Sequence, residues 1–170
     1  MTTFWTIVVG VLSSVVASAV WLVALRGLRP AIEISPLIAQ DPERSNSYHV
    51  KIINRSRRAL VDVSFDIAII RIARTRGGTV DMRKTVRVAG PPPLIIPARK
   101  KDGTDNIYRL RVDADLRGTL EIDDRHSVRI RIFARDAWSG VGRVAERRYH
   151  DPGTEIAVGK YAKGSTFDVV

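Results

Sequence analysis

Cysteine is absent from the 170 residues of this sequence. Its absence excludes disulfides, thiolate metal ligands and a lipid-modified cysteine from the chain, and is typical of a reducing compartment such as the cytoplasm. Histidine is nearly as scarce. His49, His126 and His150 lie far apart, and none stands in a metal-binding spacing such as H-E-x-x-H. We therefore predict no metal site and no cofactor.

Catalytic motifs are missing as well. The sequence has no G-x-S-x-G elbow and no phosphate-binding P-loop. Segment 140–145 matches G-x-G-x-x-A, but the turn signal at 151–153 follows too soon for the crossover helix of a dinucleotide site. We predict no catalytic residue. An enzyme would need a pocket that brings His126 or His150 close to carboxylates, which sequence spacing does not decide.

Charge of either sign is absent from Phe4–Leu25. As a helix this run spans about 33 Å, enough to cross a bilayer core of about 30 Å. Twelve of its 22 residues are Phe, Ile, Leu or Val, which favour insertion by several kcal/mol. Trp5 and Trp21 are spaced to reach the two headgroup layers as interfacial anchors. The sequence predicts a membrane anchor at residues 1–29.

The flanking residues predict the orientation of this anchor. Arg26 and Arg29 follow the apolar run and no charged side chain precedes it, so the positive-inside rule places residues 30–170 in the cytoplasm and the N-terminus outside. Arginine outnumbers lysine 22 to 6, which is typical of a GC-rich bacterial genome. We therefore expect a single-pass protein of the bacterial inner membrane. The alternative is a signal peptide cleaved after the A-x-A sequence at 17–19, but the apolar run continues beyond that point.

Three small residues, Gly10, Ser14 and Ser18, repeat every four positions on one face of the predicted helix. Small residues at this spacing let two membrane helices approach closely. We predict that they form a helix–helix interface.

Beyond residue 30, alternating apolar and polar residues replace helical periodicity. Turn signals such as Gly77-Gly78 separate the alternating segments. This pattern predicts an all-β domain, an antiparallel sandwich or a closed barrel of eight or nine strands. The expected strands are 31–38, 48–53, 60–73, 79–88, 94–96, 107–112, 127–134, 143–149 and 165–170.

Residues 48–56, Tyr-His-Val-Lys-Ile-Ile-Asn-Arg-Ser, followed by Ala-Leu-Val-Asp-Val at 59–63, resemble a pattern in bacterial immunoglobulin-like domains. In that pattern an apolar strand ends at Asn-x-Ser before a turn. The resemblance implies an immunoglobulin-like sandwich and no activity. The layout of one N-terminal helix and a cytoplasmic β-domain is also similar to small bacterial proteins that include membrane effectors of nucleotide-signalling antiphage systems.

Acidic residues are outnumbered, 18 against 28 Lys and Arg, which gives a net charge of +10. The basic residues are scattered among acidic ones, so we do not expect nucleic acid as a partner. Two pairs, Arg109 with Arg111 and Arg129 with Arg131, project opposite the apolar residues of their strands. If the two strands pair, four guanidinium groups share one face that could bind phosphate, lipid headgroups or an acidic protein. Alternatively, these arginines form ordinary ion pairs with exposed carboxylates.

Together these features predict a non-enzymatic interaction module, tethered to the lipid bilayer, that docks a protein partner or assembles with copies of itself. Tethering would raise its effective concentration for any partner held at the same surface. The alternative is a ligand-gated membrane effector, in which an anionic ligand on the arginine-bearing face triggers clustering of the helices.

Overall fold

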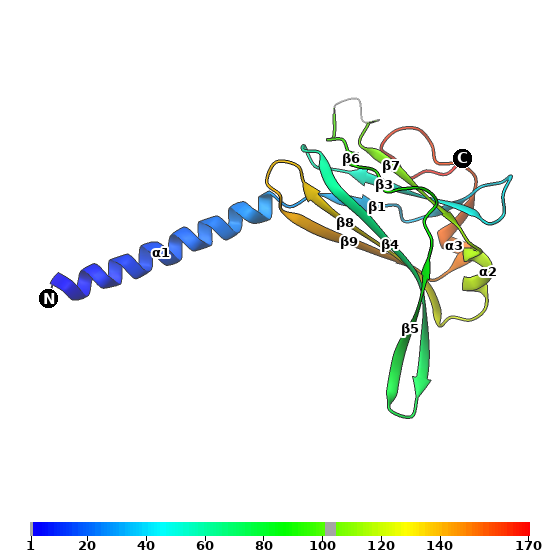
Figure 1. Cartoon of the computed structure of the whole chain (residues 1–170), viewed down its shortest axis with the longest axis horizontal. Coiled ribbons are helices and arrows are strands. Elements are labelled where there is room, and N and C mark those ends of the chain that lie inside the picture. The colour runs from blue at the N-terminus through cyan, green and yellow to red at the C-terminus, as the bar shows by residue number, and fades with distance from the viewer. Residues whose placement is uncertain (1, 101–104) are drawn as a thin grey trace.

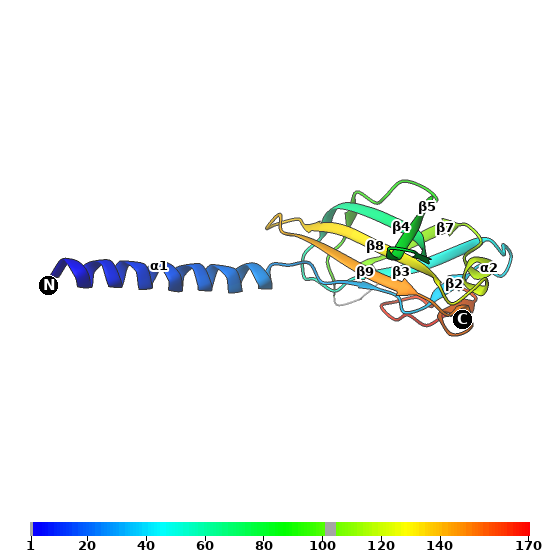
Figure 2. The ribbon, with the colours of Figure 1, turned by 90° about the horizontal axis from the view of Figure 1, so that it is seen from below.

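The computed structural model describes residues 2–100 and 105–170, apart from the side chains of residues 2, 3 and 26. Helix α1 (Thr2–Gly27) projects from one end of a β-rich domain (Figures 1 and 2). The prediction of an apolar N-terminal helix followed by a mostly β chain is confirmed. We refer to residues 30–170 as the β-domain.

The strands form two open sheets, so the alternative of a closed barrel is wrong. The first sheet contains β1 (Ile32–Ile34), β2 (Ile38–Gln40), β3 (Ser47–Asn54), β7 (Ile107–Asp113) and β10 (Ile156–Val158). The second contains β4 (Leu60–Thr75), β5 (Gly78–Val86), β6 (Ile95–Ile96), β8 (His126–Asp136) and β9 (Gly142–Tyr149). Two short helices, α2 (Leu116–Glu121) and α3 (Pro152–Glu155), lie at the end of the β-domain opposite α1 (Figure 1).

The hydrophobic core lies between the two sheets and is built by the alternation of residues along each strand. Burying each large aliphatic side chain contributes about 1.5–3 kcal/mol. From β3 and β8, the two strands that supply much of the core, the inward-facing and fully buried side chains are Tyr48, Val50, Ile52, Val128, Ile130 and Ile132. The arginines of β8 therefore point away from the core, as the sequence predicts.

The alternation in β4 shifts once, and the sequence pattern does not reveal it. Asp62 has a φ of +52°, and the pairing of β4 with β8 changes register between Val61 and Ser64. Such a β-bulge inserts an extra residue and turns the following side chains over. Consequently Leu60 and Val63 are both buried, whereas simple alternation places Leu60 on the outer face.

Three expected strands or pairings are wrong. Segment 31–38 is not one strand. The strand is interrupted between β1 and β2 around Pro36, which has no N–H to donate. Segment 165–170 forms only an isolated bridge, between Val169 and Tyr161. The sheets are not wholly antiparallel, since β10 pairs with β2 in parallel.

The Gly77-Gly78 turn signal lies at a hairpin between β4 and β5, with Arg76 and Gly77 in the turn. Thr75 of β4 pairs with Gly78 of β5 across a two-residue turn. The φ of Gly78 is +131°, a conformation that residues with a Cβ rarely adopt. The hairpin extends beyond the rest of the second sheet (Figure 1).

A buried tyrosine joins the two sheets and makes the stability of the fold sensitive to alkali. The Tyr149 hydroxyl donates to the Ser35 carbonyl at 2.6 Å, and burial raises the pKa of Tyr149 far above its ordinary value near 10. Above pH 10 the unfolded chain loses a proton that the native state keeps, so stability is complete below pH 10 and declines above it, by up to about 1.4 kcal/mol per pH unit.

We therefore expect the variant Tyr149→Phe to lose about 1–2 kcal/mol at pH 7, because the Ser35 carbonyl loses its donor. The same variant should lose less additional stability than the wild type between pH 10 and 11. Urea unfolding of both proteins at pH 7, 10 and 11 measures these differences. An unchanged alkaline decline in the variant would contradict this explanation.

Candidate functional site

The apolar helix takes no part in the packing of the β-domain. None of Phe4–Leu25 is buried, and the mean hydropathy of the segment is 2.4. Trp5 and Trp21 are 64% and 62% exposed, so both are free to face another environment. The Arg29 side chain is exposed at the helix exit, while the Arg26 side chain lies outside the described part of the structure.

On α1, serine hydroxyls near the three small residues Gly10, Ser14 and Ser18 bond back to carbonyls of their own helix. The Ser18 hydroxyl donates to the Ser14 carbonyl at 2.9 Å, and the neighbouring Ser13 hydroxyl donates to the Gly10 carbonyl at 3.0 Å. A Cβ atom added at Gly10 would meet no atom within 4 Å. The face is therefore sterically open in the single chain.

The four predicted arginines do not share a face. Strand β7, which carries Arg109 and Arg111, pairs with β3 in the first sheet, whereas β8 carries Arg129 and Arg131 in the second. Both pairs point away from the core, but from opposite sheets. The sequence predicts which face of each strand they occupy, and it does not determine which strands pair.

On the first sheet, the C-terminal segment covers the predicted arginines in part. Arg109 donates to the Tyr161 carbonyl at 3.3 Å, and the fully buried Lys51 donates to the carbonyls of Ala162 and Thr166 at 2.9 and 2.6 Å. Burial lowers the pKa of Lys51. Arg111 forms a two-bond pair with Asp113, at 2.8 and 3.0 Å. On the first sheet, therefore, Lys51, Arg109 and Arg111 already bind acceptors of the same chain.

On the second sheet, four arginines from three strands meet two carboxylates. We call this surface the arginine face; it consists of Arg83 (β5), Asp66 (β4), Arg129 and Arg131 (β8), and Glu146 and Arg148 (β9). The Glu146 carboxylate accepts from the Arg131 Nε at 2.5 Å and from the Arg148 Nε at 2.9 Å. The hydrogen bond from Arg131 is the main cause that lowers the pKa of Glu146. Asp66 is bound by Arg83.

Arg129 is the least satisfied member of the arginine face. Its residue is only 8% exposed, its Nε atom has no hydrogen-bond partner, and its Nη2 lies 4.0 Å from Asp66, beyond hydrogen-bond distance. It also lies directly opposite Arg148 on the neighbouring strand. Like charges in such a pair repel, and a buried donor without an acceptor is costly. An additional carboxylate or phosphate would relieve both effects.

Two of the three histidine residues contact carboxylates, and His126 also lines a cavity of about 320 Å³. Within residues 2–100 and 105–170, no group of three His, Asp or Glu side chains is arranged to hold a metal ion. His126 contacts Asp123 at 2.7 Å, and the backbone N–H of His150 donates to Glu155. His49 lines a small cavity of about 210 Å³ with Asp41 and Arg109.

The sequence reasoning missed Arg83, Arg148 and the two carboxylates of the arginine face. The sequence shows that these residues lie in segments of alternating polarity. Their proximity, however, depends on β4 lying between β5 and β8. The Gly77-Gly78 turn signal between β4 and β5 was the one local feature that could have brought Arg83 close to Asp66.

Comparisons with known proteins do not assign a function. No family model matches the chain, and no curated protein matches it. A solved structure that matches is the X-ray structure of Northeast Structural Genomics Consortium target SoR45, with 17% identity over 74% of this chain and 89% of that chain, and a TM-score of 0.31. A similarity of this size carries no functional argument.

Proposed function

We propose that this protein is a membrane-tethered, non-enzymatic interaction module that docks a partner or assembles with copies of itself. The observation that carries the proposal is the exposed apolar helix. A run of 22 uncharged residues that packs against nothing in its own β-domain needs another apolar environment, and its length matches a bilayer core. The helix then acts by confining the β-domain to a surface.

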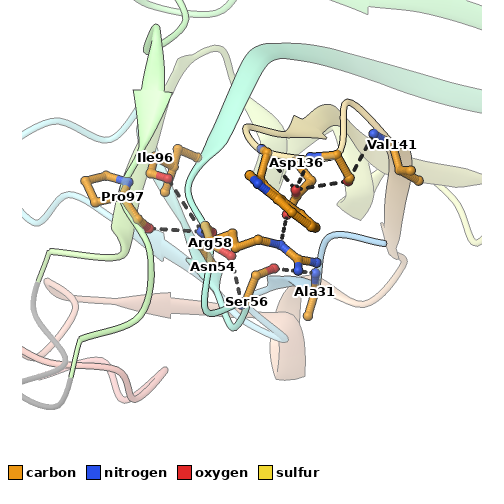
Figure 3. Close-up of polar contacts among 10 residues, drawn as sticks. Ala31, Asn54, Ser56, Arg58, Ile96, Pro97, Asp136 and Val141 are labelled. Carbon is orange, nitrogen blue, oxygen red and sulfur yellow. Dashed lines mark hydrogen bonds and ion pairs between the residues drawn. The ribbon is translucent and has the colours of Figure 1, made fainter. Parts of the chain in front are cut away.

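In the same proposal the protein spans the bacterial inner membrane once, with the N-terminus outside and residues 30–170 in the cytoplasm. The position of Arg29 after the helix supports this orientation. We further propose that the β-domain is an immunoglobulin-like sandwich. The support is the end of β3 at Asn54, whose side chain accepts from the Ser56 N–H at 2.9 Å and donates to the Arg58 carbonyl at 2.8 Å (Figure 3).

The arginine face is our proposed docking surface, and an acidic protein segment is its proposed partner. Its four guanidinium groups face only two carboxylates, so the surface has an excess of positive charge. Arginine binds carboxylates in bidentate geometry, and Arg129 has an unused donor. An acidic segment would supply the missing acceptors.

The test is in-cell crosslinking of the tagged protein, extraction from host membranes in mild detergent and identification of bound proteins by mass spectrometry. The proposal expects a stoichiometric partner that is lost in the double variant Arg83→Gln, Arg148→Gln. The control, Arg44→Gln with Lys163→Gln, removes the same charge from exposed positions elsewhere and should retain the partner. Recovery that is equal in both variants would contradict docking at the arginine face.

The alternative function is a ligand-gated effector, and the open small-residue face of α1 favours it. In that case an anionic ligand on the arginine face promotes helix clustering through Gly10, Ser14 and Ser18, and the membrane is disturbed. Self-crosslinked species that disappear in the variant Gly10→Leu, Ser14→Leu, with no other protein recovered, would favour the effector over the docking module.

Arg129 gives a prediction that separates binding from folding. We expect Arg129→Met to raise the free energy of unfolding by about 1 kcal/mol, because a buried cation whose Nε has no acceptor is replaced by an apolar side chain and Asp66 keeps Arg83. The same variant should weaken partner recovery. Urea unfolding in detergent measures the first effect. A loss of more than about 1 kcal/mol would mean that Arg129 stabilises the fold.

A further inference from the structure

The β-domain begins very close to the end of the apolar helix. From Leu25 to Pro30 the chain can extend at most about 14 Å, since α1 continues to Gly27. At Pro30 the chain is already fixed, because its carbonyl accepts from Arg143 at 2.9 Å. The headgroup layer alone occupies about 5–8 Å on each side of the bilayer. If α1 spans the membrane, this end of the β-domain lies at or next to the headgroups.

Two loops form this end of the β-domain. The loop between β3 and β4 is tied to the helix exit, since the Ala31 N–H donates to the Ser56 hydroxyl at 2.7 Å and the Arg55 N–H donates to the Ala31 carbonyl at 2.7 Å. The loop between β8 and β9 joins it through the Ala137 N–H, which donates to the Ala59 carbonyl at 3.0 Å. Figure 3 shows the two loops side by side, next to Ala31.

The tip of the β8–β9 loop carries an exposed tryptophan. Trp138 is 77% exposed and is the only tryptophan of the chain outside α1. The loop backbone is held there, because the backbone N–H of Trp138 donates to Asp136 at 3.1 Å, and the Arg58 guanidinium lies 5.8 Å from the centre of the indole ring. An exposed indole is the type of side chain that lies at a membrane–water interface.

Arginines also belong to this end of the β-domain: Arg29 follows α1, Arg57 lies in the β3–β4 loop and Arg143 lies near the start of β9. Arg29 and Arg57 are exposed, and neither they nor Arg143 form an ion pair with any residue in 2–100 or 105–170. Asp136, the carboxylate that accepts from the Trp138 backbone, is fully buried and already bound to Arg58. A space of about 680 Å³ opens between Arg29 and Arg143, lined further by Val141, Gly142 and Val144. Its size and charge suit a lipid headgroup.

We propose that this end of the β-domain is a lipid-docking surface. Trp138 enters the headgroup layer of an anionic bilayer, while Arg29, Arg57 and Arg143 bind lipid phosphates. This inference rests on the membrane tether of the proposed function. Its consequence is a fixed orientation: β8 and β9 run away from the membrane, so the arginine face is presented sideways to partners on the same surface (Figure 1).

The experiment places the full chain in nanodiscs of phosphatidylcholine, with or without phosphatidylglycerol. In the variant Trp5→Phe, Trp21→Phe, Trp138 is the sole tryptophan, and excitation at its red edge avoids the tyrosines. The control adds Trp138→Phe and Ile122→Trp, which places the probe at an exposed position at the opposite end of the β-domain. We expect acrylamide to quench Trp138 several-fold less than the control probe in phosphatidylglycerol nanodiscs, and brominated lipid to quench only Trp138.

Removing two of the cations tests the role of charge. Each basic residue near an anionic surface contributes about fivefold to binding, so Arg29→Gln with Arg57→Gln should reduce the ratio of docked to undocked domains about 25-fold. Equal quenching of both probes by acrylamide, or protection of Trp138 without quenching by brominated lipid, would overturn lipid docking. Protection that the double variant leaves unchanged would overturn the role of the arginines. A chain that fails to enter nanodiscs at all would instead refute the membrane tether.

Discussion

Two arginines in the centre of α1, in the variant Leu12→Arg, Val16→Arg, are expected to release the protein from the membrane fraction. Each arginine at the centre of a membrane helix costs about 2.5–3.5 kcal/mol, and each lost aliphatic residue removes about 0.3–0.6 kcal/mol of favourable transfer. The twelve Phe, Ile, Leu and Val residues of Phe4–Leu25 together favour insertion by only about 4–7 kcal/mol. The two substitutions together therefore cost about 6–8 kcal/mol, which cancels this driving force.

The release is measured by alkaline carbonate extraction followed by ultracentrifugation. Leu12→Ala with Val16→Ala is the matched control, because it shortens the same side chains without adding charge and should remain in the pellet. Since α1 is not buried against the β-domain, the double arginine variant should remain folded in the supernatant. If it stays in the carbonate-resistant pellet, α1 is not the membrane anchor.

The second large effect is expected at Asp136, the acceptor that holds the β8–β9 loop. Its side chain is fully buried and accepts from Arg58 at 2.6 Å and from the backbone N–H of Trp138 at 3.1 Å (Figure 3). It also accepts from the backbone N–H and the hydroxyl of Ser139 at 2.8 and 3.0 Å. Removing one partner of a buried ion pair costs about 3–5 kcal/mol. We expect Asp136→Ala to lose this amount and to lower the melting temperature by about 10 °C.

The control for this variant is Asp113→Ala, because Asp113 also pairs with an arginine but both side chains are exposed. Exposed ion pairs contribute about 0–1 kcal/mol, so its melting temperature should hardly change. Burial acts to raise the pKa of Asp136, but hydrogen bonds from Ser139, Arg58 and Trp138 outweigh it and hold the pKa below the ordinary value. The Asp136 contribution is therefore complete above about pH 4 and is lost as the pH falls below it. Equal losses in the two variants would contradict this account.

Local features of the fold could be predicted from the sequence. The uncharged run gave α1, and alternation located most strands to within two residues, because each strand buries one face. Gly78 marked the β4–β5 turn, since its φ of +131° excludes most other residues. The short strand β10 gave no such signal: only Ile156 of its three residues is buried, and it pairs with a distant strand.

The candidate site was predictable only in part, because it depends on contacts between distant segments. Alternation placed Arg109 and Arg129 on the outer faces of their strands, but no local property showed that β7 and β8 belong to different sheets. The burial of Lys51 also escaped prediction. It lies on the outer face of β3, where the pattern predicts solvent, and carbonyls more than 100 residues away cover it.

The most direct test of the account compares partner capture by the full chain and by residues 30–170. The hydrophobic core contains only residues from Ile32 onward, so the shorter chain keeps the whole core. We expect both to bind the same purified partner in solution with equal affinity, and only the full chain to be crosslinked to it efficiently in cells. If residues 30–170 bind nothing in solution, the helix is part of the binding unit, and a docking module that is merely tethered by it is wrong.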